Sequence, residues 1–159
     1  MRGISAKSMR QTESMTNSEI SFCWLNNCMM TGESMFEYYN VNPAGRNVGD
    51  CTVRAISAGT GQGWEETYTG LCVEGLSLFD MPSSNAVWGS YLESKGFKRR
   101  MMPDTCPQCY TVSRFAEEHP SGTYILALSG HVVCVKDGHW LDSWDSGNEI
   151  VLYFWERTD

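Results

Sequence analysis

The chain lacks any apolar run that approaches the roughly 20 residues needed to cross a membrane. Its early basic residues are not followed by an apolar core, which argues against a secretory signal. Positive charge is also scarce, with 12 Lys and Arg against 19 Asp and Glu and a net charge of −7. A nucleic-acid binder needs a positive face. We therefore expect a cytoplasmic protein that binds neither nucleic acid nor membrane.

The basic and sulfur-containing residues that are present have a simple interpretation. Lys98-Arg99-Arg100 forms the one basic cluster, and it is predicted to be a solvated turn. The seven cysteines are odd in number, which favours a reducing compartment over a disulfide framework. Cys72 and Cys134 fall on apolar stripes and are predicted to be buried. Cys51 does not, and this difference separates it from them.

Residues 1–34 differ from the rest of the chain. They hold five of the nine methionines, no proline, and no helical or strand period. We interpret them as a disordered leader, or as an upstream reading-frame extension with initiation at Met35. Residues 35–159 are long enough to form one domain with its own core.

Within residues 35–159, helical patterns come first and strand patterns follow. Asp50 is a good N-cap residue, so a helix is expected to begin at Cys51. Asp137-Gly138 is a strong two-residue hairpin signal. The other predicted helices begin at Trp64, after Pro82-Ser83-Ser84 and after Thr111; the predicted strands are 35–40, 124–128, 131–135, 139–144 and 150–155. The order predicts an α+β fold with N-terminal helices packed on a C-terminal antiparallel sheet.

Cys51 lies in the first turn of its predicted helix, where free N–H groups and the positive end of the helix dipole favour a thiolate. His131 opens an apolar strand next to a glycine and is the best candidate to take the thiol proton. Asp142, on the next strand, would orient the imidazole. Asp145 is the rival for that role, and we favour Asp142 because Asp145 falls in the turn after the strand.

An oxyanion needs two donors directed at one point. The backbone N–H of Cys51 supplies one candidate donor. The side chain of Asn47, four residues earlier, is the second candidate. The alternative for Asn47 is a loop residue that only stabilises its own turn.

The segment Asp50-Cys51-Thr52-Val53-Arg54-Ala55-Ile56, together with His131-Val132-Val133 and Leu141-Asp142, resembles the papain-like cysteine peptidase superfamily. Within it, the chain is most similar to small bacteriocin-leader-type peptidase domains of bacteria and phages. The resemblance spans roughly residues 36–157. It implies a papain-like fold in which Cys51, His131 and Asp142 are nucleophile, base and orienting acid. The chain departs from the family by lacking a Gln ahead of the nucleophile, where Asn47 is the nearby amide, and by having Thr52 after Cys51 instead of Gly.

Cys106-Pro107-Gln108-Cys109 is a second constellation. Two thiols at this spacing suit half of a zinc site or a redox pair. Cys23, Cys28 and His119 are the further zinc ligands that the sequence offers. The alternative is a pair of reduced loop thiols.

The sequence as a whole predicts a cysteine hydrolase that cleaves a peptide or amide bond through a Cys-His-Asp triad and a thioester. Its partner would be a peptide or protein substrate, and the chemistry implies no cofactor. One alternative is an inactive papain-like binding protein. A zinc-stabilised module built on Cys106 and Cys109 is the other.

Overall fold

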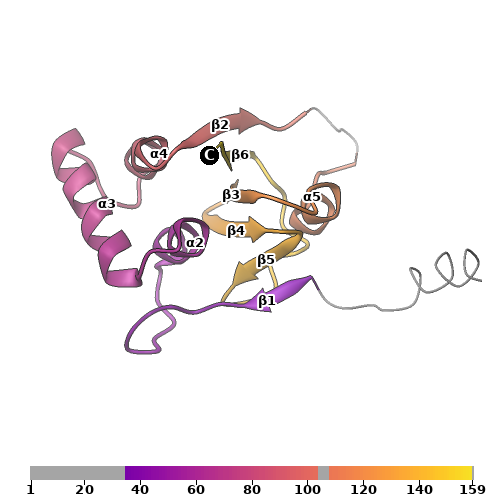
Figure 1. The fold of residues 1–159 in the computed structure, drawn as a ribbon, viewed down its shortest axis with the longest axis horizontal. Coiled ribbons are helices and arrows are strands. Elements are labelled where there is room, and N and C mark those ends of the chain that lie inside the picture. The colour runs from indigo at the N-terminus through magenta and orange to yellow at the C-terminus, as the bar shows by residue number, and fades with distance from the viewer. Residues whose placement is uncertain (1–34, 104–107, 159) are drawn as a thin grey trace, which may run out of the picture. The chain divides into compact units, whose positions relative to one another are not determined.

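A computed structural model describes residues 35–103 and 108–158 of the chain (Figure 1). The leader proposed for residues 1–34 lies outside the described residues. Within them the fold is α+β, with four helices and a six-stranded mixed sheet. The helices are α2 (Cys51–Thr60), α3 (Trp64–Leu78), α4 (Asn85–Ser94) and α5 (Val112–Glu118); the strands are β1 (Phe36–Tyr38), β2 (Phe97–Met101), β3 (Thr123–Leu128), β4 (His131–Lys136), β5 (His139–Asp142) and β6 (Tyr153–Arg157). None of these helices is long and apolar enough to span a membrane.

The sheet has the strand order β1-β5-β4-β3-β6-β2. Its pairs are antiparallel with one exception, because β1 runs parallel to β5. The prediction of an antiparallel sheet was therefore wrong at this edge. Neighbouring strands joined by a tight hairpin must be antiparallel. No such turn links β1 to β5, so the direction of β1 could not be predicted from local sequence signals.

Strand β2 corrects a second prediction. Lys98, Arg99 and Arg100 do not form a solvated turn but lie in this edge strand, which pairs with β6. Arg100 Nε donates to Glu156 at 3.0 Å, and the Arg99 guanidinium lies 4.2 Å from the centre of the Tyr153 ring. Because charged side chains project from both sides of this edge strand, the alternation that identifies a strand is missing.

The core lies on both faces of the sheet. Ile125 and Cys134 pack on one face with α2 and α4, whereas Leu126 and Val133 pack on the other face with α5. Figure 1 shows the sheet between α2 and α4 on one side and α5 on the other. This alternation in β3 and β4 follows from the two-residue period of a strand. Cys134 is buried as predicted, but Cys72 is only half-buried.

Helix α3 ends in an unusual way. Phe79 follows the helix in the left-handed region, with φ 54°, and its N–H bonds to the carbonyl oxygens of Gly75 and Leu76. Glycine is the residue that usually occupies this position, because a Cβ clashes with the next carbonyl. The Phe79 ring offers no compensation through packing, since 95% of the residue is exposed.

Replacing Phe79 with Asn is expected to raise the free energy of unfolding by about 1 kcal/mol, because Asn tolerates the left-handed conformation. Urea unfolding of the full chain measures this change. The matched control is Leu76→Asn, which removes an exposed apolar residue from the body of α3 and is expected to give no gain. A loss of stability in Phe79→Asn would show that the ring supports the fold.

Candidate active site

The structure brings Cys51, His131 and Asp142 together at one end of the sheet. β4 begins at His131 and its antiparallel neighbour β5 ends at Asp142, so both residues lie at the same end. Helix α2 begins at Cys51 and packs against the face of β4 that carries Val132 and Cys134. Sheet register and helix packing therefore determine where the three side chains lie.

Asp142 is the carboxylate that contacts the imidazole. His131 Nε2 lies 2.6 Å from Asp142 Oδ2, which also accepts the Ser146 hydroxyl at 2.8 Å. The backbone N–H of Ser143 donates to Asp142 Oδ1 at 2.7 Å. Asp145 lies elsewhere, since its Oδ1 accepts from Trp140 Nε1 at 3.1 Å. The arrangement fixes the imidazole and leaves Nδ1 as the ring nitrogen available to the thiol.

A buried arginine connects this carboxylate to the start of α2. Arg54 is only 4% exposed, and its guanidinium donates to Asp50 Oδ1 and lies 3.8 Å from Asp142 Oδ1. Asp50 occupies the N-cap position, but its side chain forms no capping bond. Its other oxygen accepts from Trp64 Nε1 at 2.8 Å. Asp50 thus serves a buried ion network instead of the helix cap that the sequence suggested.

The electrostatics of Cys51 and His131 favour an ion pair. Burial on its own raises the Cys51 pKa, but the hydrogen bond and positive charge of His131 outweigh it, and the net pKa is lowered. Burial on its own lowers the His131 pKa, but hydrogen bonds with Asp142 and Cys51 and their charges raise it to about 9. The lowered pKa of the thiol and the raised pKa of the imidazole both favour transfer of the Cys51 proton to His131.

Trp144 covers the imidazole from the solvent side. Its ring centre lies 5.3 Å from that of His131, with the two planes tilted by 45°. Trp144 is 44% exposed, so it is a partial cover and not part of the core. Restricting water here strengthens the His131–Asp142 hydrogen bond, because electrostatic interactions grow as the local dielectric falls.

Cys51 and His131 open onto a cleft of about 420 Å³. Apart from these two residues it is lined by Gly49, Thr52, Ser83, Asn85, Trp88, Ala127, Leu128, Gly130, Val132, Leu152 and Tyr153. Asn47 is exposed and is not among the lining residues. The amide in the cleft is Asn85, whose Oδ1 accepts from Trp88 Nε1 at 3.1 Å. The cleft carries no Asp, Glu, Lys or Arg side chain.

The proposed metal ligands are only partly described. Cys109 is exposed and free, whereas Cys106, Cys23 and Cys28 lie outside the described residues. His119 Nδ1 lies 2.8 Å from the Phe115 carbonyl oxygen, and its ring stacks on that of Phe115. In residues 35–103 and 108–158, no three His, Cys, Asp or Glu side chains are grouped so that they could hold a metal ion.

Three residues of the site were not predicted: Arg54, Ser146 and Asn85. The spacing of Asp50 and Arg54, four residues apart on a helix, was a usable signal for an ion pair. Ser146 and Asn85 gave no signal, because each depends on a partner brought close by the fold.

Comparisons of the chain with family models, curated proteins and solved structures found no match.

The reactivity of Cys51 toward iodoacetamide tests the ion pair. We expect labelling to begin on the acid side of an ordinary thiol, because only the thiolate reacts and the Cys51 pKa is lowered. In His131→Ala the onset should move to higher pH, with a rate at pH 6 lower by about tenfold or more. Mass spectrometry of the labelled peptides measures both, with Cys72, also half-buried, as the internal reference. Equal rates for Cys51 and Cys72 at pH 6 would contradict the ion pair.

The buried arginine has a matched test. Arg54→Met leaves Asp50 and Asp142 without their shared cation, and we expect a loss of about 3 kcal/mol in unfolding free energy. Arg100→Met breaks a half-exposed ion pair with Glu156 and is expected to cost less than about 1 kcal/mol. Urea unfolding of both variants provides the measurement. Similar losses would mean that Arg54 does not carry the network.

Proposed function

We propose that the protein is a cysteine hydrolase of the papain-like type that cleaves a peptide or amide bond. The observation that carries the proposal is the Cys51–His131–Asp142 arrangement, with a lowered Cys51 pKa and a raised His131 pKa, at the edge of an open cleft. The α+β fold and the helix start at Cys51 support it. A cleft without other charged side chains is consistent with a neutral carbonyl substrate.

The reaction would begin with attack of the Cys51 thiolate on the carbonyl carbon. The carbon–sulfur bond forms while the π electrons of the carbonyl move to oxygen. The tetrahedral intermediate then collapses, the carbon–nitrogen bond breaks, and the His131 imidazolium gives its Nδ1 proton to the leaving amine. Asp142 holds the ring in place through Nε2 during this transfer.

Water would complete the cycle. His131, now neutral, takes a proton from a water molecule that attacks the thioester, and the acyl group leaves as a carboxylic acid. The sulfur is released as a thiolate beside the imidazolium, which restores the starting ion pair. No redox partner or metal is needed for these steps to balance.

The oxyanion would be held by the backbone N–H of Cys51, in the first turn of α2, and by the side chain of Asn85. Asn85 Oδ1 is occupied by Trp88, which leaves its NH₂ group to donate. Asn85 replaces Asn47 as the side-chain candidate because Asn47 is exposed and does not line the cleft.

The cellular setting in this proposal is a reducing one such as the cytoplasm. Support comes from the four cysteines of the described residues, Cys51, Cys72, Cys109 and Cys134, which are all free. The substrate would be a peptide or protein, since the net charge of −7 disfavours nucleic acid.

A binding protein of the same fold is the second candidate. It is favoured by one observation: the side-chain amide predicted from sequence, Asn47, does not reach the cleft. An enzyme without a second oxyanion donor would retain a reactive thiolate but turn over very slowly.

The test is hydrolysis of a mixture of synthetic peptides by the full chain, followed by mass spectrometry of the products. We expect cleavage that is lost in Cys51→Ala and His131→Ala and retained in Cys72→Ala. Asn85→Ala should lower kcat about 100-fold with the Cys51 alkylation rate unchanged. Rapid alkylation of Cys51 without any cleavage or acyl-enzyme would favour the binding protein.

A further inference from the structure

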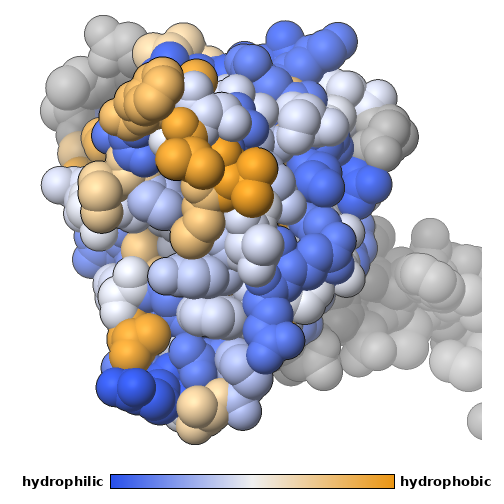
Figure 2. All heavy atoms as spheres, turned by 90° about the vertical axis from the view of Figure 1, so that its left-hand side faces the viewer, coloured by the Kyte–Doolittle hydropathy of each residue, from blue (hydrophilic) through white to orange (hydrophobic). Residues whose placement is uncertain are grey.

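The C-terminal half of α3 carries apolar side chains that the fold leaves uncovered. Leu76, Phe79 and Met81 are 75%, 95% and 68% exposed, and Val73 lies one turn before Leu76. We call these four residues the α3 face. Figure 2 views the molecule from the side of α3, and hydrophobic residues gather in the upper part of this view. A contiguous apolar surface of this kind usually marks an interaction site.

The α3 face is hollowed as well as apolar. An open depression of about 490 Å³ is lined by Cys72, Gly75, Leu76, Phe79, Asp80, Met81 and Pro82. Gly75 packs closely on the turn after α3, since a Cβ at this position would lie 2.7 Å from the Asp80 carbonyl oxygen. Such a hollow can receive one large side chain of a partner, the arrangement found at the centre of binding surfaces.

Phe79 indicates that the apolar surface is not incidental. Its left-handed backbone is unfavourable for a residue with a side chain, and its ring contributes almost no burial to the fold. Glycine or asparagine would serve the helix end better. Local strain that the fold does not use is typical of functional positions.

The segment that includes the α3 face is acidic, and its charge favours one kind of occupant. From Trp64 to Ser94 the chain has five acidic residues, Glu65, Glu66, Glu74, Asp80 and Glu93, and no Lys, Arg or His. Asp80 itself lines the hollow. A second copy of the chain would bring this acidic segment against its own equivalent, and an anionic membrane would be repelled.

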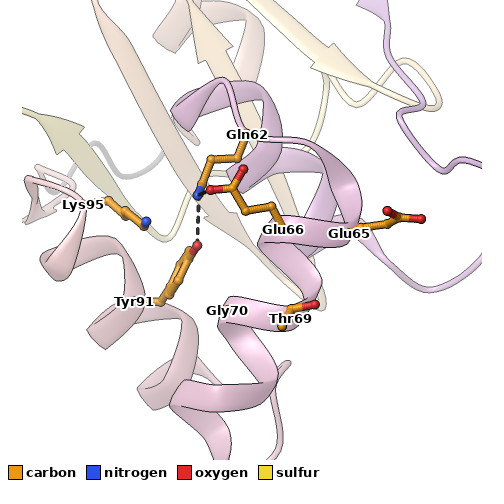
Figure 3. Close-up of a pocket in the computed structure, with 7 residues that line it drawn as sticks. All are labelled: Gln62, Glu65, Glu66, Thr69, Gly70, Tyr91 and Lys95. Carbon is orange, nitrogen blue, oxygen red and sulfur yellow. Dashed lines mark hydrogen bonds between the residues drawn. The ribbon is translucent and has the colours of Figure 1, made fainter.

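The neighbouring hollow at the start of α3 does not compete for the same role. Figure 3 shows Gln62, Glu66 and Tyr91 directed toward one another, with the Tyr91 hydroxyl donating to Gln62 at 3.0 Å. Lys95 lies over the Tyr91 ring. These polar groups form hydrogen bonds and ring contacts with one another. Glu65 extends away from them and adds to the negative charge of α3.

We propose that the α3 face docks a cationic polypeptide segment. This segment would place an apolar side chain in the hollow and Lys or Arg side chains against the acidic residues between Trp64 and Ser94. Apolar burial supplies the affinity, and the charges select the partner and speed association. This surface is independent of the cysteine chemistry proposed above.

The test uses the full chain and two fluorescent synthetic helices, one with leucine and lysine on opposite faces and one with leucine and glutamate. We expect the leucine/lysine helix to bind, with affinity that falls as salt is raised, and the leucine/glutamate helix not to bind. Phe79→Asn should weaken binding about tenfold or more. The control Tyr38→Asn, which removes a 69% exposed aromatic residue on β1, should leave it unchanged.

Charge is tested with a second matched pair. Glu65→Lys should weaken binding and reduce its salt dependence, whereas Glu117→Lys, at an exposed position of α5, should not. Equal binding of both helices, or an unchanged affinity in Phe79→Asn, would overturn the proposal. A dimer in sedimentation that Phe79→Asn dissolves would make the occupant a second copy and also overturn it. Binding to phosphatidylglycerol vesicles that Phe79→Asn abolishes would overturn it in favour of a membrane.

Discussion

The buried carboxylate of Asp142 is the constraint on which the candidate site depends. A carboxylate that is 3% exposed must be neutralised and hydrogen-bonded, because an unpaired buried charge is strongly destabilising. His131, Ser146 and the Ser143 N–H bond to it directly, and Arg54 lies nearby. The same Arg54 holds Asp50, next to the thiol. Charges of alternating sign therefore run from Asp50 through Arg54, Asp142 and His131 to Cys51.

Apolar packing determines where α2 lies on the sheet, and the ion network determines how its first residue, Cys51, is oriented. Ala55 and Ile56 of α2 are buried against the sheet in the cluster that holds Cys134, which brings the start of the helix to the start of β4. Packing of this kind is not directional. Hydrogen bonds and ion pairs are directional, so the network through Arg54 orients the start of α2 toward the imidazole. The network orients the imidazole and the start of α2, and the cleft gives access to Cys51 and His131.

Much of the fold was readable from local patterns. The hairpin signal at Asp137-Gly138 and the apolar runs of β3 and β4 identified the centre of the sheet, and the helix start at Cys51 is as expected. Strand β2 was missed because its charges hide the period, and the direction of β1 because no turn constrains it. The sequence favoured Asp142 over Asp145 but left both possible, since the two residues are only three positions apart at the end of a strand. The hydrogen bonds distinguish them, because Trp140 donates to Asp145 whereas Asp142 contacts His131.

Asp142 and Phe79 show two ways in which local cost indicates function. The cost of burying Asp142 is compensated within the fold by its hydrogen bonds with His131, Ser143 and Ser146 and by the nearby Arg54. Its burial is therefore accounted for by the candidate site. The strain at Phe79 is not compensated by burial among the described residues, and this contrast is the reason that we infer a partner for it. The turn after α3 lies between the two regions: Met81 and Pro82 line the hollow, and Ser83 and Asn85 line the cleft. The turn of residues 81–85 therefore belongs to both regions, because it contributes to the hollow at one end and to the cleft at the other.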